Sequence, residues 1–281
     1  MFDKITIVGM GLIGGSIGMA CVRRGVARKV VAVVRRESAK AEVRDRDAAH
    51  DVTLDLQEGV AGADLVVLCA SVEAIPELAK QAAPALSPKT IVTDVASVKA
   101  AIVSRLDKAL NDICRFVGSH PMAGGERAGI ANADPDLFRD AVCLVTPTER
   151  TDPEALETLT QFWQQLGGTV ESLGPDEHDE AVALVSHLPH VVAAAVMRAI
   201  GRASDPARAI RVAGPSFRDV TRIASSPPEM WTQICLSNRD ALLAAVRACA
   251  DEAGRFAACL EAGDVEGLRA FFAEAKTLKD A

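Results

Sequence analysis

A glycine-rich stretch near the N-terminus, VGMGLIGGS at residues 8–16, constrains the fold more than any other feature of the chain. It matches the pattern G-x-G-x-x-G directly after a strand-like apolar run and directly before a segment of helical period. In dinucleotide-binding folds, the first glycine allows a tight turn, the second lets the backbone approach the pyrophosphate, and the third lets the helix pack closely on the strand. The helix N-terminus then faces the negative charge. We therefore predict a dinucleotide-binding turn, with Gly9, Gly11, Leu12, Ile13 and Gly14 as cofactor-binding residues.

The rest of the N-terminal half alternates apolar runs with helical segments, which is typical of a doubly wound parallel sheet. The expected strands are residues 4–8, 29–34, 63–70, 90–95, 115–119, 141–147 and 169–173. Further on, residues 176–203, 237–262 and 265–278 have helical spacing and no clear strand. The expected fold class is α/β, with a Rossmann-type dinucleotide-binding domain at residues 1–174 and an all-helical domain for substrate binding and dimerisation at residues 175–281. These helices carry more alanine and leucine than one small bundle can bury, which favours a homodimer.

The residues expected to meet the adenosine ribose indicate which dinucleotide is bound. Twenty residues after Gly14, where a ribose-binding acid is expected, the chain has Val34, followed by Arg35 and Arg36. Two guanidinium groups can bind a 2′-phosphate through charge-assisted hydrogen bonds. NADP is therefore the expected cofactor, and Ser71, after the third expected strand, joins the two arginines among its contacts. Two alternatives stay open: the arginines are ordinary surface charges, or Glu37 binds the ribose of NAD.

Composition narrows the class of protein. The net charge is −7 over 281 residues, with no basic stripe, which argues against nucleic acid as a partner. No apolar run suggests a membrane span, and the first residues enter a strand without a targeting leader. Seven cysteines fall mostly in apolar runs, with no C-x-x-C pair, so neither disulfides nor a metal site is expected. We expect a cytoplasmic protein without a metal, whose partner is a small anionic molecule.

Several polar side chains follow expected strands or lie on expected helices. Ser97 in TDVASVK and His120 in GSHPMAGGE each come after a strand of the parallel sheet. Ligands bind at that edge of such sheets, so both residues are expected beside a nicotinamide. In SHLPHVV, His187 and His190 share one helical face, either in a site or capping carbonyl groups around Pro189.

Further along the chain, SFRDVTRIASSPPEMW contains two arginines one helical turn apart, a spacing suited to binding a carboxylate. They are Arg218 and Arg222, and Trp231 ends the segment.

Taken in order, these motifs resemble the prephenate/arogenate dehydrogenase family of tyrosine biosynthesis over nearly the whole chain. Besides the glycine turn, the similar segments are TDVASVK, GSHPMAGGE, LVTPTERTDPE, DEHDEAVALVSHLPH and SFRDVTRIA. VVRRES resembles the NADP-using, arogenate-type branch. The resemblance implies oxidative decarboxylation of a cyclohexadienol: hydride leaves C4, a base takes the hydroxyl proton, and loss of carbon dioxide aromatises the ring.

The resemblance also implies roles for individual residues. His120 matches the base and Ser97 its hydroxyl partner. The substrate-site matches are His190, Arg222, Glu126 and Trp231, with Arg218 as a second positive charge nearby. Arogenate and prephenate both remain open as substrates. Two other functions also remain open: a non-catalytic NADP-binding sensor and a related 3-hydroxyacid or imine oxidoreductase, although such enzymes usually use a lysine that residues 175–260 lack.

Overall fold

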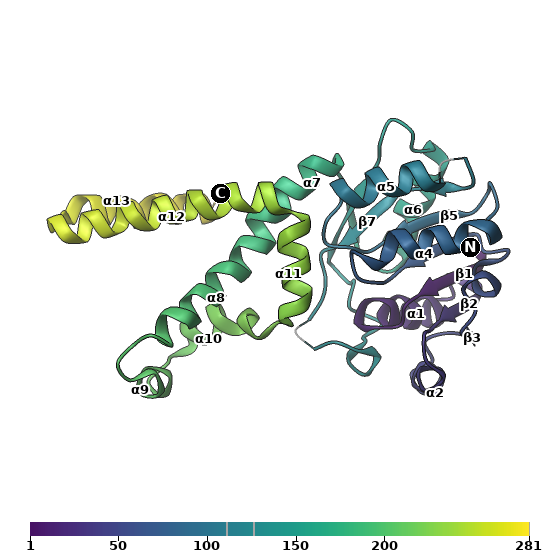
Figure 1. The fold of residues 1–281 in the computed structure, drawn as a ribbon, viewed down its shortest axis with the longest axis horizontal. Helices are drawn as coiled ribbons and strands as arrows, with labels where there is room; N and C mark the ends of the chain where they lie inside the picture. Colours follow the sequence, from purple (N-terminus) through teal and green to yellow (C-terminus); the bar gives the residue numbers. More distant parts are fainter. Residues whose placement is uncertain (111, 126, 281) are drawn as a thin grey trace.

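The computed structural model describes residues 1–110, 112–125 and 127–280. Its N-terminal half is an α/β domain, and its C-terminal half consists of helices that extend away from that domain (Figure 1). The α/β and helical organisation expected from the sequence is therefore present.

A six-stranded parallel sheet forms the centre of the N-terminal half, in the order β3-β2-β1-β4-β5-β6. Its strands are β1 (Phe2–Val8), β2 (Ala27–Val33), β3 (Asp51–Thr53), β4 (Leu65–Leu68), β5 (Ile91–Asp94) and β6 (Arg115–Phe116). The helices between them are α1 (Leu12–Arg24), α2 (Glu37–Asp45), α3 (Leu56–Val60), α4 (Ala74–Ala82) and α5 (Ala100–Leu110). This strand order is that of a dinucleotide-binding fold, with its crevice at the carboxyl ends of β1 and β4, where the strand order reverses. The sequence did not indicate β3, because three residues are too short to show a period.

The last expected strands do not continue the parallel sheet. A second, three-stranded sheet contains β7 (Gly118–Pro121), β8 (Val142–Thr146) and β9 (Thr169–Ser172), with β7 antiparallel to β8. The expected strand 115–119 is split, since β6 pairs with β5 and β7 turns to β8 after one residue. A Cβ on Gly118 would lie 2.5 Å from Oγ1 of Thr146, so glycine allows the close approach of β8. His120 therefore lies on a strand of the second sheet, and not after a strand of the parallel sheet as expected from the sequence.

Hydrophobic side chains fill both faces of the parallel sheet. One cluster contains Ile5, Ile7 and Ile17 with Trp163 of α6 (Pro153–Gln165), and Trp163 packs edge-to-face on Phe138. The other cluster lies under α4 and α5. These clusters fix the positions of the strand ends from which the site residues project.

The C-terminal half begins with one long helix, Pro175–Ile200. It consists of α7 (Pro175–Val182), a π-helical turn (Ala183–His187) and α8 (Leu188–Ile200). After it come α9 (Pro206–Arg211), α10 (Pro215–Thr221), a 3₁₀ turn (Arg222–Ser225), α11 (Pro228–Ser237), α12 (Arg239–Ala262) and α13 (Val265–Asp280).

This first helix corrects the expectation that no segment suggests a membrane span. By length and composition alone, its 26 residues are long and apolar enough to cross a membrane, and only 22% of its most apolar stretch is buried. Acidic residues in the first turn and scattered histidines interrupt the run in the sequence and conceal this property. The same helix, however, makes buried polar contacts with the nucleotide-binding half. One such helix is weak grounds for a membrane segment.

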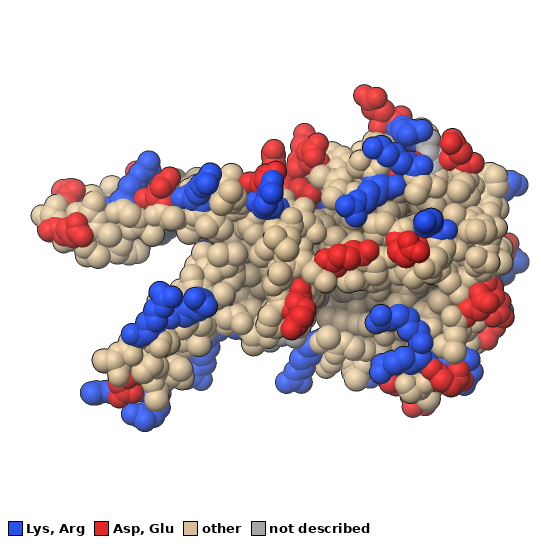
Figure 2. All heavy atoms as spheres, viewed as in Figure 1, with Lys and Arg blue, Asp and Glu red and all other residues tan. Residues whose placement is uncertain are grey.

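The helical half forms two separate arms (Figure 1). One arm contains the distal part of α8 with α9 and α10, and the other is the hairpin of α12 and α13. Figure 2 shows an open wedge between the arms on the face in view. The described residues of α9, α10 and α13 include none that is buried.

Candidate active site

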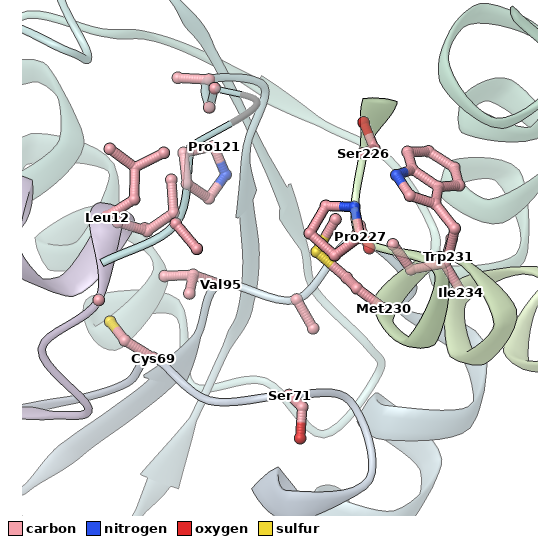
Figure 3. A pocket seen from close by; sticks show the side chains of 18 of the residues that line it. Leu12, Cys69, Ser71, Val95, Pro121, Ser226, Pro227, Met230, Trp231 and Ile234 are labelled. Carbon is pink, nitrogen blue, oxygen red and sulfur yellow. The ribbon is translucent and has the colours of Figure 1, made fainter. Parts of the chain in front are cut away.

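A cavity of about 600 Å³ lies between the two halves of the chain. The glycine turn, the ends of β4 and β5 and the loop after β7 line one side. The other side is formed by α8, the 3₁₀ turn and α11, from which Pro227, Met230 and Trp231 face Leu12 and Pro121 across the opening (Figure 3). The cavity therefore joins the dinucleotide turn to the helical half.

The glycine turn has the geometry that a dinucleotide requires. Gly9 has a φ of +97°, and a Cβ there would lie 2.2 Å from the carbonyl oxygen of Cys69. A Cβ on Gly14 would lie 2.0 Å from the carbonyl oxygen of Gly9, whereas one on Gly11 would meet nothing within 4 Å. Helix α1 has no side-chain cap and no acidic residue in its first turn, so its N–H groups face the crevice without a competing anion. These residues fit a pyrophosphate.

Most of the expected cofactor-binding residues line the cavity. Gly11, Leu12, Ile13, Gly14 and Ser71 are part of its wall. Arg35 and Arg36 are exposed, directly after β2, and do not line it. They lie where the chain turns from β2 into α2, the position at which the sequence places a ribose contact.

His120 and Ser97, from the two expected strand ends, both line the cavity. His120 is 8% exposed, and burial, with the nearby charge of Lys99 as a smaller cause, lowers its pKa well below 6.5. A neutral imidazole at neutral pH can accept a proton. Among the described residues, no hydrogen bond joins Ser97 to His120.

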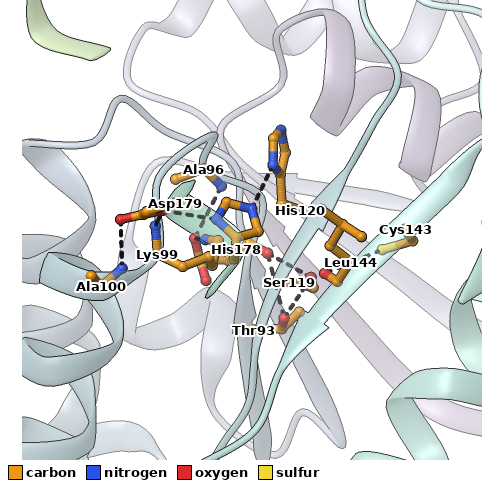
Figure 4. Close-up of polar contacts among 11 residues, drawn as sticks. Thr93, Ala96, Lys99, Ala100, Ser119, His120, Cys143, Leu144, His178 and Asp179 are labelled. Atoms are coloured by element: carbon orange, nitrogen blue, oxygen red, sulfur yellow. Dashed lines mark hydrogen bonds and ion pairs between the residues drawn. The ribbon is translucent and has the colours of Figure 1, made fainter. Parts of the chain in front are cut away.

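The hydrogen-bonded neighbour of His120 is a residue that the sequence did not indicate. Nδ1 of His120 lies 2.9 Å from Nε2 of His178, and Nδ1 of His178 lies 2.8 Å from a carboxylate oxygen of Asp179 (Figure 4). Both partners come from α7, and both are buried. His178 and Asp179 lie in DEHDEA, an acidic segment that is typical of the exposed first turn of a helix. The only local signal was a histidine beside an acid, which is too common to single out.

A fully buried ion pair lies next to these rings. Lys99 and Asp94, at the end of β5, form a salt bridge, and neither side chain is exposed. The backbone N–H groups of Lys99 and Ala100 donate to the two carboxylate oxygens of Asp179, at 2.7 and 3.0 Å. Asp179 thereby ties α7 to the start of α5.

The two histidines of SHLPHVV differ in environment. His190 lines the cavity and stacks on Trp231, with ring centroids 3.6 Å apart. Its Nδ1 lies 3.0 Å from the carbonyl of Ser186, as the capping alternative anticipated, and burial lowers its pKa. His187 is buried and does not line the cavity. Nδ2 of Asn238 lies 3.1 Å from its Nδ1, and burial lowers the pKa of His187 to about 4.

The two arginines of SFRDVTRIA are not brought together at the cavity. Arg222 lines it, at the point where α10 gives way to a 3₁₀ turn. Arg218 is exposed outside it, and its guanidinium donates to the carbonyl of Ala213 at 3.1 Å. The change of helix type ends the regular spacing on which the expectation relied. Glu126, the remaining substrate candidate, lies outside the described residues.

A dinucleotide turn, a neutral buried histidine and an arginine around one cavity are the features of a two-domain, dinucleotide-dependent oxidoreductase. Comparison with protein families identifies it more closely. Residues 17–172 match the nucleotide-binding domain of prephenate dehydrogenase, and residues 174–274 match its dimerization domain. The chain belongs to the prephenate dehydrogenase family and is an oxidoreductase.

Relatives with names and structures agree with this assignment. Cyclohexadienyl dehydrogenase of Zymomonas mobilis is 35% identical over 246 residues, which cover 86% of this chain and 83% of the relative. Prephenate dehydrogenase from Aquifex aeolicus, in complex with hydroxyphenyl propionate and NAD+, superposes with a TM-score of 0.91 at 29% identity, covering 99% of this chain and 98% of that one. Synechocystis arogenate dehydrogenase gives a TM-score of 0.84 at 32% identity, covering 99% of both chains.

Proposed function

We propose that this protein oxidises and decarboxylates prephenate, arogenate or both in tyrosine biosynthesis, with NADP as the preferred cofactor. The observation that carries the proposal is the neutral, buried His120 in a cavity that the glycine turn lines on one side and Arg222 on the other. Family membership supports the reaction, and the names of the relatives include both substrates.

The residues of the chain supply the acid–base chemistry and the binding. The substrate hydroxyl gives its proton to His120, and Ser97, on the same wall, positions that hydroxyl. Arg222 binds a substrate carboxylate, and the stacked pair of His190 and Trp231 packs against the ring. A bound nicotinamide would supply the acceptor for the hydride that leaves C4 of the substrate. Loss of carbon dioxide then makes the ring aromatic.

The preference for NADP rests on the two exposed arginines after β2. Arg35 and Arg36 follow Val34, whose side chain is buried and cannot accept a hydrogen bond from a ribose hydroxyl. Glu37, the alternative ribose ligand, forms an ion pair with Lys40 at 3.0 Å. A pair of cations at this position favours the additional phosphate of NADP.

We further propose a cytoplasmic homodimer with its domain boundary at residue 174. The cysteines among the described residues are all free thiols, which suits a reducing compartment. The last strand ends at Ser172 and the first long helix begins at Pro175. The match of the helical half to a dimerization domain, and the low burial of that half, support the dimer.

The test is reduction of NADP+ or NAD+ on adding prephenate, arogenate or a simple 3-hydroxyacid, with the aromatic product and carbon dioxide quantified. We expect one carbon dioxide released per cofactor reduced with at least one of the two cyclohexadienols. His120→Asn should lower kcat by about 10²–10⁴-fold, the usual worth of a positioned base. Cofactor reduction only with the 3-hydroxyacid would replace this proposal with the 3-hydroxyacid alternative, and cofactor binding without any reduction would favour a sensor.

A further inference from the structure

A buried chain of hydrogen bonds runs from His120 away from the cavity into the helical half. It passes from Nδ1 of His120 to Nε2 of His178, and from Nδ1 of His178 to Oδ1 of Asp179 (Figure 4). The His178 side chain has no exposed surface, and Asp179 is 6% exposed. Neither residue lines the cavity, so neither can contact a ligand there.

The backbone around Asp179 decides which atoms carry protons. Both of its carboxylate oxygens accept N–H groups, from Lys99 and from Ala100. An oxygen that also faces Nδ1 of His178 at 2.8 Å must accept there as well, because an ionised carboxylate has no proton to donate. Nδ1 of His178 is therefore protonated.

The proton assignment of His120 follows from that of its neighbour. With its proton on Nδ1, a neutral His178 presents a lone pair at Nε2. Nδ1 of His120, 2.9 Å away, must then donate, which leaves the lone pair of His120 on Nε2. The opposite tautomer of His120 would place two lone pairs against each other in a buried site. Burial and the nearby charge of Lys99 lower the pKa of His120, so an additional proton on its ring is disfavoured.

We propose that His178 and Asp179 are positioning residues that hold His120 in the tautomer whose basic nitrogen is Nε2. This inference rests on the proposed role of His120 as the base. When the substrate O–H bond breaks, its proton forms a bond to Nε2 of His120, and Nδ1–H of the resulting imidazolium continues to donate to His178. The positive charge is thereby stabilised along a chain that ends at the carboxylate of Asp179. The same carboxylate holds the start of α5, so docking of the helical half fixes the base.

The first test is the protonation of His120 in the wild-type protein without substrate. ¹⁵N chemical shifts of the imidazole nitrogens can be followed for the five histidines, with His120→Asn used to assign the signals. We expect Nδ1 of His120 to be protonated and Nε2 to be unprotonated at neutral pH. A proton on Nε2 would overturn the proposal. This measurement needs no turnover, so it stands apart from the proposed function, which fails on its own if neither cyclohexadienol is oxidised.

The second test compares two replacements of His178. His178→Asn keeps a donor for Asp179 but cannot reach His120, whereas the carbonyl oxygen of His178→Gln can accept from Nδ1 of His120. Loss of the partner that orients a metal-ligating histidine typically costs about 10–100-fold in activity, and we expect His178→Asn to lower kcat by a similar factor. KM should change little, because His178 does not line the cavity. His178→Gln should recover most of the lost kcat.

The tautomer of His120 should change in parallel with kcat in the two variants. His178→Asn should shift His120 toward a proton on Nε2, and His178→Gln should restore the wild-type pattern. A His178→Asn enzyme with kcat within twofold of wild type would contradict the proposal. So would equal losses of kcat in both variants, which would indicate a merely structural role. If His178→Asn does not fold, the tautomer of His120 in the wild-type protein still tests the proposal.

Discussion

At the scale of single residues, the proposed cofactor preference depends on Arg35 and Arg36. Both follow the last residues of β2 and are exposed, and among the described residues neither forms an ion pair. A 2′-phosphate carries roughly −1.5 to −2 charges at neutral pH. Each charge-assisted hydrogen bond is worth about 1.5–3 kcal/mol, which corresponds to roughly tenfold to hundredfold in affinity.

We therefore expect the double variant Arg35→Ala, Arg36→Ala to raise the KM for NADP by about 10–100-fold and to leave the KM for NAD nearly unchanged. Steady-state kinetics with both cofactors measures this. Arg28→Ala serves as the control, because it removes an exposed arginine at the opposite end of β2. Equal wild-type efficiency with NAD and NADP would instead assign the ribose to Glu37.

At the scale of elements, strand β7 and the helix Pro175–Ile200 each carry a buried histidine with a lowered pKa. Burial lowers the pKa of His187 from 6.5 to about 4, and it lowers the pKa of His120 well below 6.5. Below pH 6.5 the unfolded chain binds protons at these positions that the folded chain does not bind. The free energy of unfolding therefore falls as the pH falls from 6.5 toward these lowered pKa values.

We expect the free energy of unfolding to fall by about 1.4 kcal/mol per pH unit for each such histidine over this range. Above pH 6.5 these histidines should add nothing to its pH dependence. Urea unfolding at a series of pH values measures it. His187→Gln should reduce the slope of the free energy of unfolding against pH by the contribution of one histidine. A free energy of unfolding that stays constant between neutral and mildly acidic pH would mean that the histidines titrate normally.

At the scale of the whole molecule, apolar surface is concentrated on the helical half. Of the large hydrophobic side chains that are exposed, all but Met1, Leu54 and Val142 belong to residues after 174. They lie on the long first helix, on both arms and on α11. Figure 2 shows the arms separated by an open wedge on the face in view. Exposed apolar surface concentrated on one part of a chain favours an interface there, and a symmetric dimer buries the same surface on both subunits.

We expect light scattering at micromolar concentration to give twice the mass of the 29.5 kDa chain. Leu260→Glu, which places a charge on α12 at a position 57% exposed in the single chain, should weaken the dimer. Leu54→Glu, at a similarly exposed position in the nucleotide-binding half, should leave the mass unchanged. A monomeric wild-type protein would contradict the proposed dimer.

Local sequence was enough to predict most of the strands, the change from an α/β half to a helical half, and one edge of the site. The glycine turn requires a positive φ at Gly9 and close helix packing at Gly14, and both requirements act within a few residues. Period and composition separated the α/β half from the helical half for the same reason. Ser97 follows β5 as expected, whereas His120 lies within β7 of the second sheet, and both line the cavity.

Only the tertiary structure decided which distant residues meet. His120 and His178 are 58 residues apart, and Lys99 and Asp179 are 80 apart. Arg218 lies outside the cavity that Arg222 lines, because the helix changes type at Arg222. The expected strand 115–119 is divided between two sheets, because its first residues pair with β5 and its last residues pair with β8. A sequence pattern reports how a segment buries its own apolar face. It does not report which buried polar groups will form hydrogen bonds with one another, because that depends on how complete helices and strands pack.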